Sequence, residues 1–286
     1  MSYRIITDTC CDLWQEFYDS LNVRVVNLSV NFQGQTVSSY PESWLTDFYN
    51  GLRSGEAAQT SAVNPEGWKA VIEPVLAAGE DALVLAFSSG LSTTYQSAVI
   101  AAQELQEMYP DRQIRVVDTL CASMGQGLLL WYACQQRDAG LSLDELTAWC
   151  EKNKMNLCHW FTVDDLMYLK RGGRVSAATA LVGTMLQIKP VMHVDDEGHL
   201  VKVSTARGRK ASLDALAKKL GETGLPGAND TVFISHGDCK ADAKYLADKL
   251  QADYGVKKVI TYYVGAVIGS HSGPGTVALF FMGNKR

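Results

Sequence analysis

A run of hydroxyl side chains lies between an apolar segment and a long helical pattern. The stretch from Phe87 to Ser97 follows an apolar run that begins at Ala82, and the helical pattern continues to about Met108. Five of the first eight residues of this stretch carry hydroxyls. Turns between a strand and a helix are where α/β proteins bind ligands, so this turn is a candidate site for an anionic group.

The position of Ser92 within the turn indicates how an anion would be held. Thr93 and Gln96 fit a capping box, which would leave Ser92 just outside the helix and facing its positive end. The helix dipole and the hydroxyls of Ser92 and Thr93 would then stabilise a negative charge. The alternative is that the cluster only caps the helix, because Ser and Thr are common N-cap residues.

A second pair of hydroxyls, Thr60 and Ser61, precedes a helix that is expected to start near Pro65. We expect this pair to lie in a loop. Asp8 and Asp118 each come directly after a predicted strand. Because parallel strands end at one edge of a sheet, we expect these two carboxylates, the Thr60–Ser61 pair and the hydroxyl turn to lie close together.

Apolar runs alternate with helical patterns in the first half of the chain. This alternation predicts a parallel sheet with helices on both faces, and hence a three-layer α/β/α domain over residues 1–157. The expected strands are Arg4–Thr7, Val23–Val30, Ala82–Phe87 and Gln113–Val117.

The pattern changes after residue 157, and residues 158–286 are expected to form a second α/β domain with a mixed six-stranded sheet. The turn from Asp195 to Gly198 lies between two alternating segments and predicts a hairpin. A helix is expected from about Ala177 to Met185. The expected strands are Phe161–Val163, Ile188–Val194, Leu200–Ala206, Val232–Ser235, Val259–Val264 and Val277–Phe281.

The composition excludes several classes of protein. The chain has 286 residues, of which 47% are hydrophobic and 20% charged, values typical of a folded globular protein. A net charge of −5 provides no overall attraction to nucleic acid or to an anionic membrane. The chain has no apolar run of about 20 residues and no apolar leader, so we expect a cytoplasmic protein without a transmembrane segment.

Cysteine and histidine do not follow the spacing of metal ligands. The seven cysteines include no C-x-x-C pair, and the five histidines lack zinc-finger spacing. We therefore expect no metal, no disulfide and no cofactor. The adjacent Cys10 and Cys11 are either buried small side chains or reactive thiols.

Motifs for catalysis are incomplete. A phosphate-binding P-loop is absent, and too few residues follow Gly273-Pro274-Gly275 for a dinucleotide-binding unit. Ser92, Asp238 and His271 occur in the chain order of an α/β-hydrolase triad, so an acyl hydrolase is an alternative function. Thr94 replaces the second glycine of the nucleophile elbow, which weighs against it.

Several separated motifs occur in order along nearly the whole chain: Thr7-Asp8, Thr60-Ser61, residues 88–98, Val117-Asp118-Thr119, residues 169–174 and residues 269–275. Together they resemble the DegV family of bacterial fatty-acid-binding proteins. The opening Thr9-Cys10-Cys11 and the central Ser92-Thr93-Thr94 depart from the usual family pattern, but neither departure removes the hydroxyls of Thr60 and Ser92.

This resemblance implies a non-catalytic lipid-binding protein that holds one long-chain fatty acid, such as palmitate, between two domains. It implies that the carboxylate is bound by the hydroxyls of Thr60 and Ser92, with Ser61 and Thr93 beside them. It also implies a possible fatty acid kinase as partner, to which the lipid carrier presents the carboxylate. Arg174 and His271 would serve that encounter.

The energetics agree with such a ligand. Burial contributes about 0.8 kcal/mol per methylene, so fourteen methylenes supply on the order of 11 kcal/mol before association costs. The carboxylate then needs only hydroxyls and helix-end N–H groups. The apolar wall, or simply the hydrophobic core, would include Phe161, Leu166, Leu169, Leu181, Met185 and Ile188.

Overall fold

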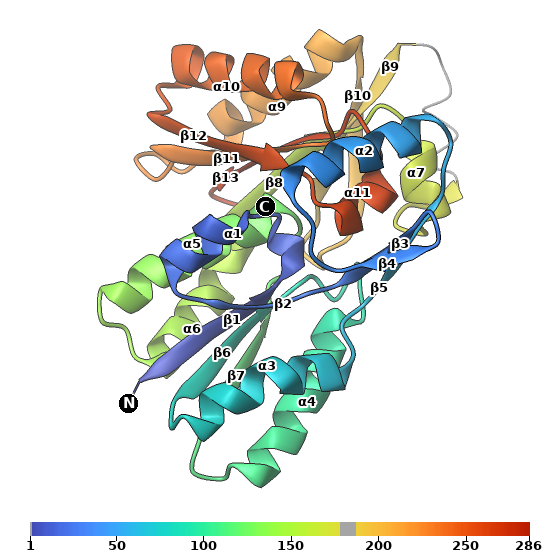
Figure 1. Ribbon diagram of the computed structural model, residues 1–286. Coiled ribbons are helices and arrows are strands. Elements are labelled where there is room, and N and C mark those ends of the chain that lie inside the picture. The colour runs from blue at the N-terminus through green and yellow to red at the C-terminus, as the bar shows by residue number, and fades with distance from the viewer. Residues whose placement is uncertain (1, 178–186) are drawn as a thin grey trace.

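A computed structural model describes residues 2–177 and 187–286 of the chain (Figure 1). The helix expected from about Ala177 to Met185 falls almost entirely outside these residues. Within the described ranges, no helix is both long and apolar enough to cross a membrane.

The first half of the chain builds a parallel four-stranded sheet in the order β2-β1-β6-β7. Its strands are β1 (Tyr3–Asp8), β2 (Arg24–Val26), β6 (Asp81–Ala86) and β7 (Ile114–Asp118). Strand β6 is buried at every residue, as a central parallel strand covered on both faces must be.

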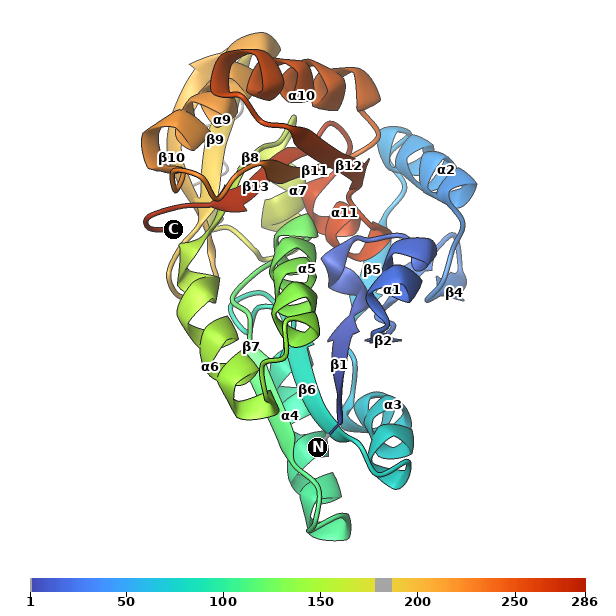
Figure 2. The ribbon, with the colours of Figure 1, turned by 90° about the vertical axis from the view of Figure 1, so that its left-hand side faces the viewer.

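Helices cover both faces of this sheet, which confirms the three-layer prediction (Figure 2). One face packs on α1 (Gln15–Leu21), α5 (Met124–Asp138) and α6 (Leu143–Asn153), with inward residues such as Ile5 and Leu83. The other face packs on α3 (Pro65–Ala77) and α4 (Thr94–Met108), with Ile6 and Val84. The alternation of neighbouring residues between two cores follows from the two-residue period of a strand.

The single strand expected over Val23–Val30 is wrong, because the structure divides it between two sheets. Strand β2 ends at Val26, and β3 (Ser29–Phe32) belongs to an antiparallel sheet with β4 (Gln35–Val37) and β5 (Ala58–Ser61). At the break, the Leu28 N–H donates to Thr9 Oγ1 at 3.0 Å. The Thr9 side chain therefore accepts from a backbone N–H that would otherwise be free to pair with a neighbouring strand. Helix α2 (Glu42–Arg53) follows β4.

The second half forms a mixed six-stranded sheet in the order β10-β9-β8-β13-β11-β12, as predicted. Its hairpin turn lies between β9 and β10, at the expected Asp195–Gly198. The strands are β8 (Leu157–Thr162), β9 (Ile188–Val194), β10 (Leu200–Arg207), β11 (Thr231–His236), β12 (Lys258–Tyr263) and β13 (Val277–Met282).

Helices α9 (Arg209–Thr223) and α10 (Lys240–Tyr254) pack on one face of this sheet. The other face contributes Phe233 and Phe280 to the same core as α5, so α5 lies between the two sheets. Short helices α7 (Leu166–Arg171) and α11 (Ala266–Ser272) lie beside each other near the antiparallel sheet (Figure 1). The division into domains at residues 157 and 158 stays a prediction.

Candidate ligand-binding pocket

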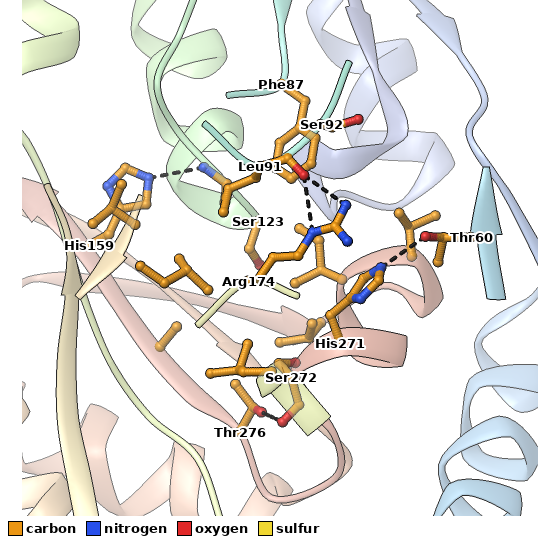
Figure 3. Close-up of a pocket in the computed structure, with 18 of the residues that line it drawn as sticks. Thr60, Phe87, Leu91, Ser92, Ser123, His159, Arg174, His271, Ser272 and Thr276 are labelled. Carbon is orange, nitrogen blue, oxygen red and sulfur yellow. Dashed lines mark hydrogen bonds between the residues drawn. The ribbon is translucent and has the colours of Figure 1, made fainter. Parts of the chain in front are cut away.

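A cavity of about 480 Å³ lies where segments from both sheets meet (Figure 3). Its lining is apolar over most of its length, and Arg174 is the one charged side chain among the described residues that form it. All six residues that the sequence indicated as binding or encounter residues line it: Thr60, Ser61, Ser92, Thr93, Arg174 and His271.

Two carboxylates, one from each of the strands that flank β6, hold the hydroxyl turn in place. Asp8 at the end of β1 accepts a hydrogen bond from the Phe87 N–H at 2.8 Å, and Asp118 at the end of β7 accepts from the Ser89 N–H at 3.1 Å. Burial raises the pKa of Asp8 to about 6, against the opposing effect of its backbone hydrogen bonds. The predicted meeting of Asp8, Asp118 and the turn at one sheet edge is confirmed.

The capping box predicted for Thr93 and Gln96 does not form. Thr93 is the N-cap of α4, but with φ −77° and ψ 3° it lacks the extended conformation of a capping residue and makes no side-chain cap bond. Ser92 Oγ instead accepts from the Thr94 N–H at 3.2 Å and lies 2.8 Å from Thr94 Oγ1. When Thr94 donates in the second contact, Ser92 keeps its own proton for a ligand.

Thr60 and His271, which both line the pocket, are hydrogen-bonded to each other. Thr60 Oγ1 lies 2.8 Å from His271 Nε2. Burial, and secondarily the positive charge of Arg174, lower the pKa of His271 to about 4, so its imidazole is neutral near pH 7. When Nε2 is the donor, the Thr60 hydroxyl has a proton left for a carboxylate.

Both of these residues lie in regular structure. Thr60, which was expected in a loop, is on strand β5, and His271 is in helix α11. Glycines flank His271, but the helix is stabilised by packing: Ala266 and Val267 are buried, and Gly269 lies against the Tyr49 ring. Tertiary contact therefore overrides the low local helix propensity.

Arg174 joins the second half of the chain to the hydroxyl turn. Its Nε and Nη2 donate to the Leu91 carbonyl at 3.1 and 2.8 Å, and its Nη1 donates to the Gly172 carbonyl. The guanidinium is half-buried and contacts the turn that contains Ser92, with His271 also beside the cavity (Figure 3).

The hydrolase triad is not assembled. Asp238 Oδ2 forms an ion pair with Arg53 Nη1 at 2.5 Å and is not part of the pocket lining. His271 is hydrogen-bonded to Thr60, so within the described ranges no relay from Ser92 through His271 to Asp238 exists. The chain order that suggested the triad carries no information about distance.

The expected apolar wall is correct in part. Phe161 and Leu169 line the pocket, whereas Leu166 is buried in the core and Ile188 is half-buried outside the lining. Leu181 and Met185 lie outside the described residues. Helical and strand periodicity identify buried positions, but they do not separate a cavity wall from solid core.

Four further polar residues of the lining were not predicted as site residues. Ser123 follows β7 in a turn of the ligand-binding type, which could have indicated it, and Ser272 lies in the motif at residues 269–275. Ser235 and His159 lie within buried strands and gave no signal. His159 is neutral, because burial lowers its pKa, and its Nε2 accepts from the Ala122 N–H at 3.2 Å.

Two other groups raised by the sequence lie outside the pocket. Cys10 and Cys11 are fully buried, and burial raises the pKa of both thiols, which favours the small-side-chain interpretation over reactivity. Ligand atoms of Asp195, Glu197 and His199 come within 4.8 Å of one another in the β9–β10 turn, a group that sequence spacing had not indicated. Glu197 and His199 are exposed.

A family model described as "Uncharacterised protein, DegV family" matches residues 2–284. A DegV domain-containing protein of Clostridium perfringens is 43% identical over 284 residues, which cover 99% of this chain and 98% of the relative. A DegV domain-containing protein of Lactococcus lactis is 34% identical over 287 residues, which cover 100% of this chain and 99% of the relative.

Solved structures show the same fold. A DegV family protein from Thermus thermophilus, described by its fatty acid binding, has a TM-score of 0.89 and 32% identity over 99% of this chain and 100% of its own. A DegV lipid-binding protein from Thermotoga maritima has a TM-score of 0.87 and 29% identity over 100% of both chains. The matches over nearly all residues, in sequence and in fold, show that this chain belongs to the DegV family.

Proposed function

We propose that the protein binds one long-chain fatty acid in this pocket. The observation that supports this most directly is the composition of the lining: a largely apolar cavity whose wall includes the residues Thr60 and Ser92. The carboxylate accepts from both hydroxyls, with Ser61 and Thr93 beside it. The fatty-acid-binding DegV proteins of Thermus thermophilus and Streptococcus agalactiae, 32% and 27% identical to this chain, support the same class of ligand.

The balance of forces favours retention of such a ligand. Transfer of about fourteen methylenes from water supplies on the order of 11 kcal/mol. The pocket offers the neutral hydroxyls of Thr60 and Ser92 as hydrogen-bond donors to the carboxylate. No proton transfer is required of these groups.

Extraction of the purified protein followed by mass spectrometry tests this function. We expect one fatty acid per chain and no hydrolysis of a generic acyl ester. Recovery of no lipid, together with ester turnover that Ser92→Ala abolishes, would instead support the hydrolase.

We further propose that the protein presents the bound carboxylate to a fatty acid kinase. Arg174 and His271 both border the pocket end, and an arginine can pair with a phosphate group. Neutral His271 can hold Thr60 in the orientation needed for the carboxylate. The protein would then act as a lipid carrier and not as a catalyst.

The test of this second step uses Arg174→Ala and His271→Ala with a cognate kinase and ATP. We expect both variants to retain fatty acid near wild-type occupancy but to fail in acyl-phosphate formation. Arg171→Ala is the matched control, because Arg171 is exposed in the same region and does not line the pocket. Loss of lipid from both variants would show that Arg174 and His271 bind the fatty acid itself. Full acyl-phosphate formation by both variants would refute their role in the encounter with the kinase.

A further inference from the structure

Two adjacent glycines, Gly172 and Gly173, lie between helix α7 and Arg174. Gly173 has a φ of 73°, a left-handed conformation that favours glycine, and a Cβ added there would meet no atom of the described residues within 4 Å. Gly172 has a φ of −71° and a ψ of −10°, which any residue adopts without strain. The backbone conformation therefore favours glycine at position 173 but not at position 172.

The space at Gly172 is instead taken by the imidazole of His271. A Cβ added to Gly172 would overlap His271 Nδ1, and it would lie 3.0 Å from the Cγ and 3.3 Å from the Cβ of the same side chain. All of these are closer than the optimal separation of carbon atoms, about 3.5 to 4.0 Å. Because the overlap extends to the root of the histidine side chain, the observed imidazole position requires a residue without a side chain at position 172.

The other nitrogen of this imidazole is hydrogen-bonded to Thr60. His271 Nε2 lies 2.8 Å from Thr60 Oγ1 (Figure 3). The ring therefore extends from the end of α7, at Gly172, to strand β5, at Thr60. Its position between these two elements determines where the Thr60 hydroxyl finds its partner.

Arg174 contacts the same glycine through the backbone. Its Nη1 donates to the Gly172 carbonyl, and its positive charge contributes to lowering the pKa of His271. Gly172 thus touches both side chains, the guanidinium through its carbonyl and the imidazole through its α-carbon. Its backbone fixes Arg174 and His271 relative to each other.

We infer that Gly172 is a positioning residue, whose missing side chain sets the place of the His271 imidazole and, through that ring, holds the Thr60 hydroxyl. The inference rests on the proposed function, in which Thr60 binds the carboxylate and Arg174 and His271 meet a kinase. A methyl group at position 172 would displace the imidazole and remove the partner of Thr60, although the backbone there accepts alanine.

Nuclear magnetic resonance of the histidine side chains in the delipidated full chain tests this role. We expect Gly172→Ala to shift the nitrogen and proton signals of the His271 imidazole, as Thr60→Val should, because both changes break the contact between the ring and Thr60. The spectrum of His271→Ala identifies these signals. Gly173→Ala is the matched control, because it strains the backbone but adds no atom near the imidazole. Unchanged His271 signals in Gly172→Ala, or an equal shift in Gly173→Ala, would overturn the inference.

A double variant separates the overlap with the imidazole from every other effect of the new methyl group. His271→Ala removes the two closest atoms, so Gly172→Ala in that background should change neither the denaturation midpoint nor the affinity for palmitate further. If Gly172→Ala alone does not fold, the double variant should fold. Equal destabilisation by Gly172→Ala with and without the imidazole would contradict the role. Failure of palmitate to bind to the wild-type chain would instead count against the proposed function, because the spectra and the unfolding curves do not depend on the ligand.

Discussion

Replacement of Thr60 by valine isolates the contribution of one hydroxyl to ligand binding. Valine keeps the branched shape that suits strand β5 and replaces the hydroxyl, with its contact to His271, by a methyl group. The fatty acid carboxylate would lose one hydrogen bond, which is worth about 1 to 3 kcal/mol for a charged acceptor. The dissociation constant should therefore rise roughly 5- to 150-fold, while the buried alkyl chain still drives measurable binding.

The assay is calorimetric titration of the delipidated protein with palmitate, together with chemical unfolding of the same samples. Thr36→Val is the matched control, because Thr36 lies on β4 of the same sheet, is exposed, and contacts only the Asn31 side chain at 3.4 Å. We expect both variants to lose about 1 kcal/mol of stability or less. Wild-type affinity in Thr60→Val, or an equal loss of affinity in Thr36→Val, would refute the role of Thr60.

Three further changes test other parts of the site. Ser92→Ala should weaken palmitate binding by about 1 to 3 kcal/mol with little change in the unfolding temperature; unfolding at much lower temperature with intact affinity would show a capping role instead. Burial raises the pKa of Asp12 to about 7 from an ordinary 3.8, so the folded state binds more protons between these values and this residue makes stability fall as pH rises through that window. Asp12→Asn should remove that contribution, and unfolding curves at pH 4 to 8 that keep the wild-type slope would contradict the assignment. Gly125→Ala should destabilise the protein by a few kcal/mol, because the new Cβ would overlap the His159 ring; an unchanged denaturation midpoint would show that His159 moves aside.

The sequence alone indicated the six strands of the second sheet and one edge of the first. The strands are apolar or alternating runs, and the β9–β10 hairpin lies at the predicted Asp195–Gly198 turn. Strand β8 (Leu157–Thr162) was located only at its end, because the expected strand was Phe161–Val163. The meeting of Asp8, Asp118 and the hydroxyl turn followed from topology, because parallel strands end at a common edge. These features depend on local periodicity and chain order, which a sequence contains.

The tertiary structure decided how the pocket is built. The break between β2 and β3 depends on a hydrogen bond from Leu28 to Thr9, and helix α11 depends on packing against α2. Neither has a local signal. Whether a buried hydroxyl is paired, as in Ser123, or lacks a partner among residues 2–177 and 187–286, as in Ser272, depends on atoms that come together from distant segments only when the chain has folded.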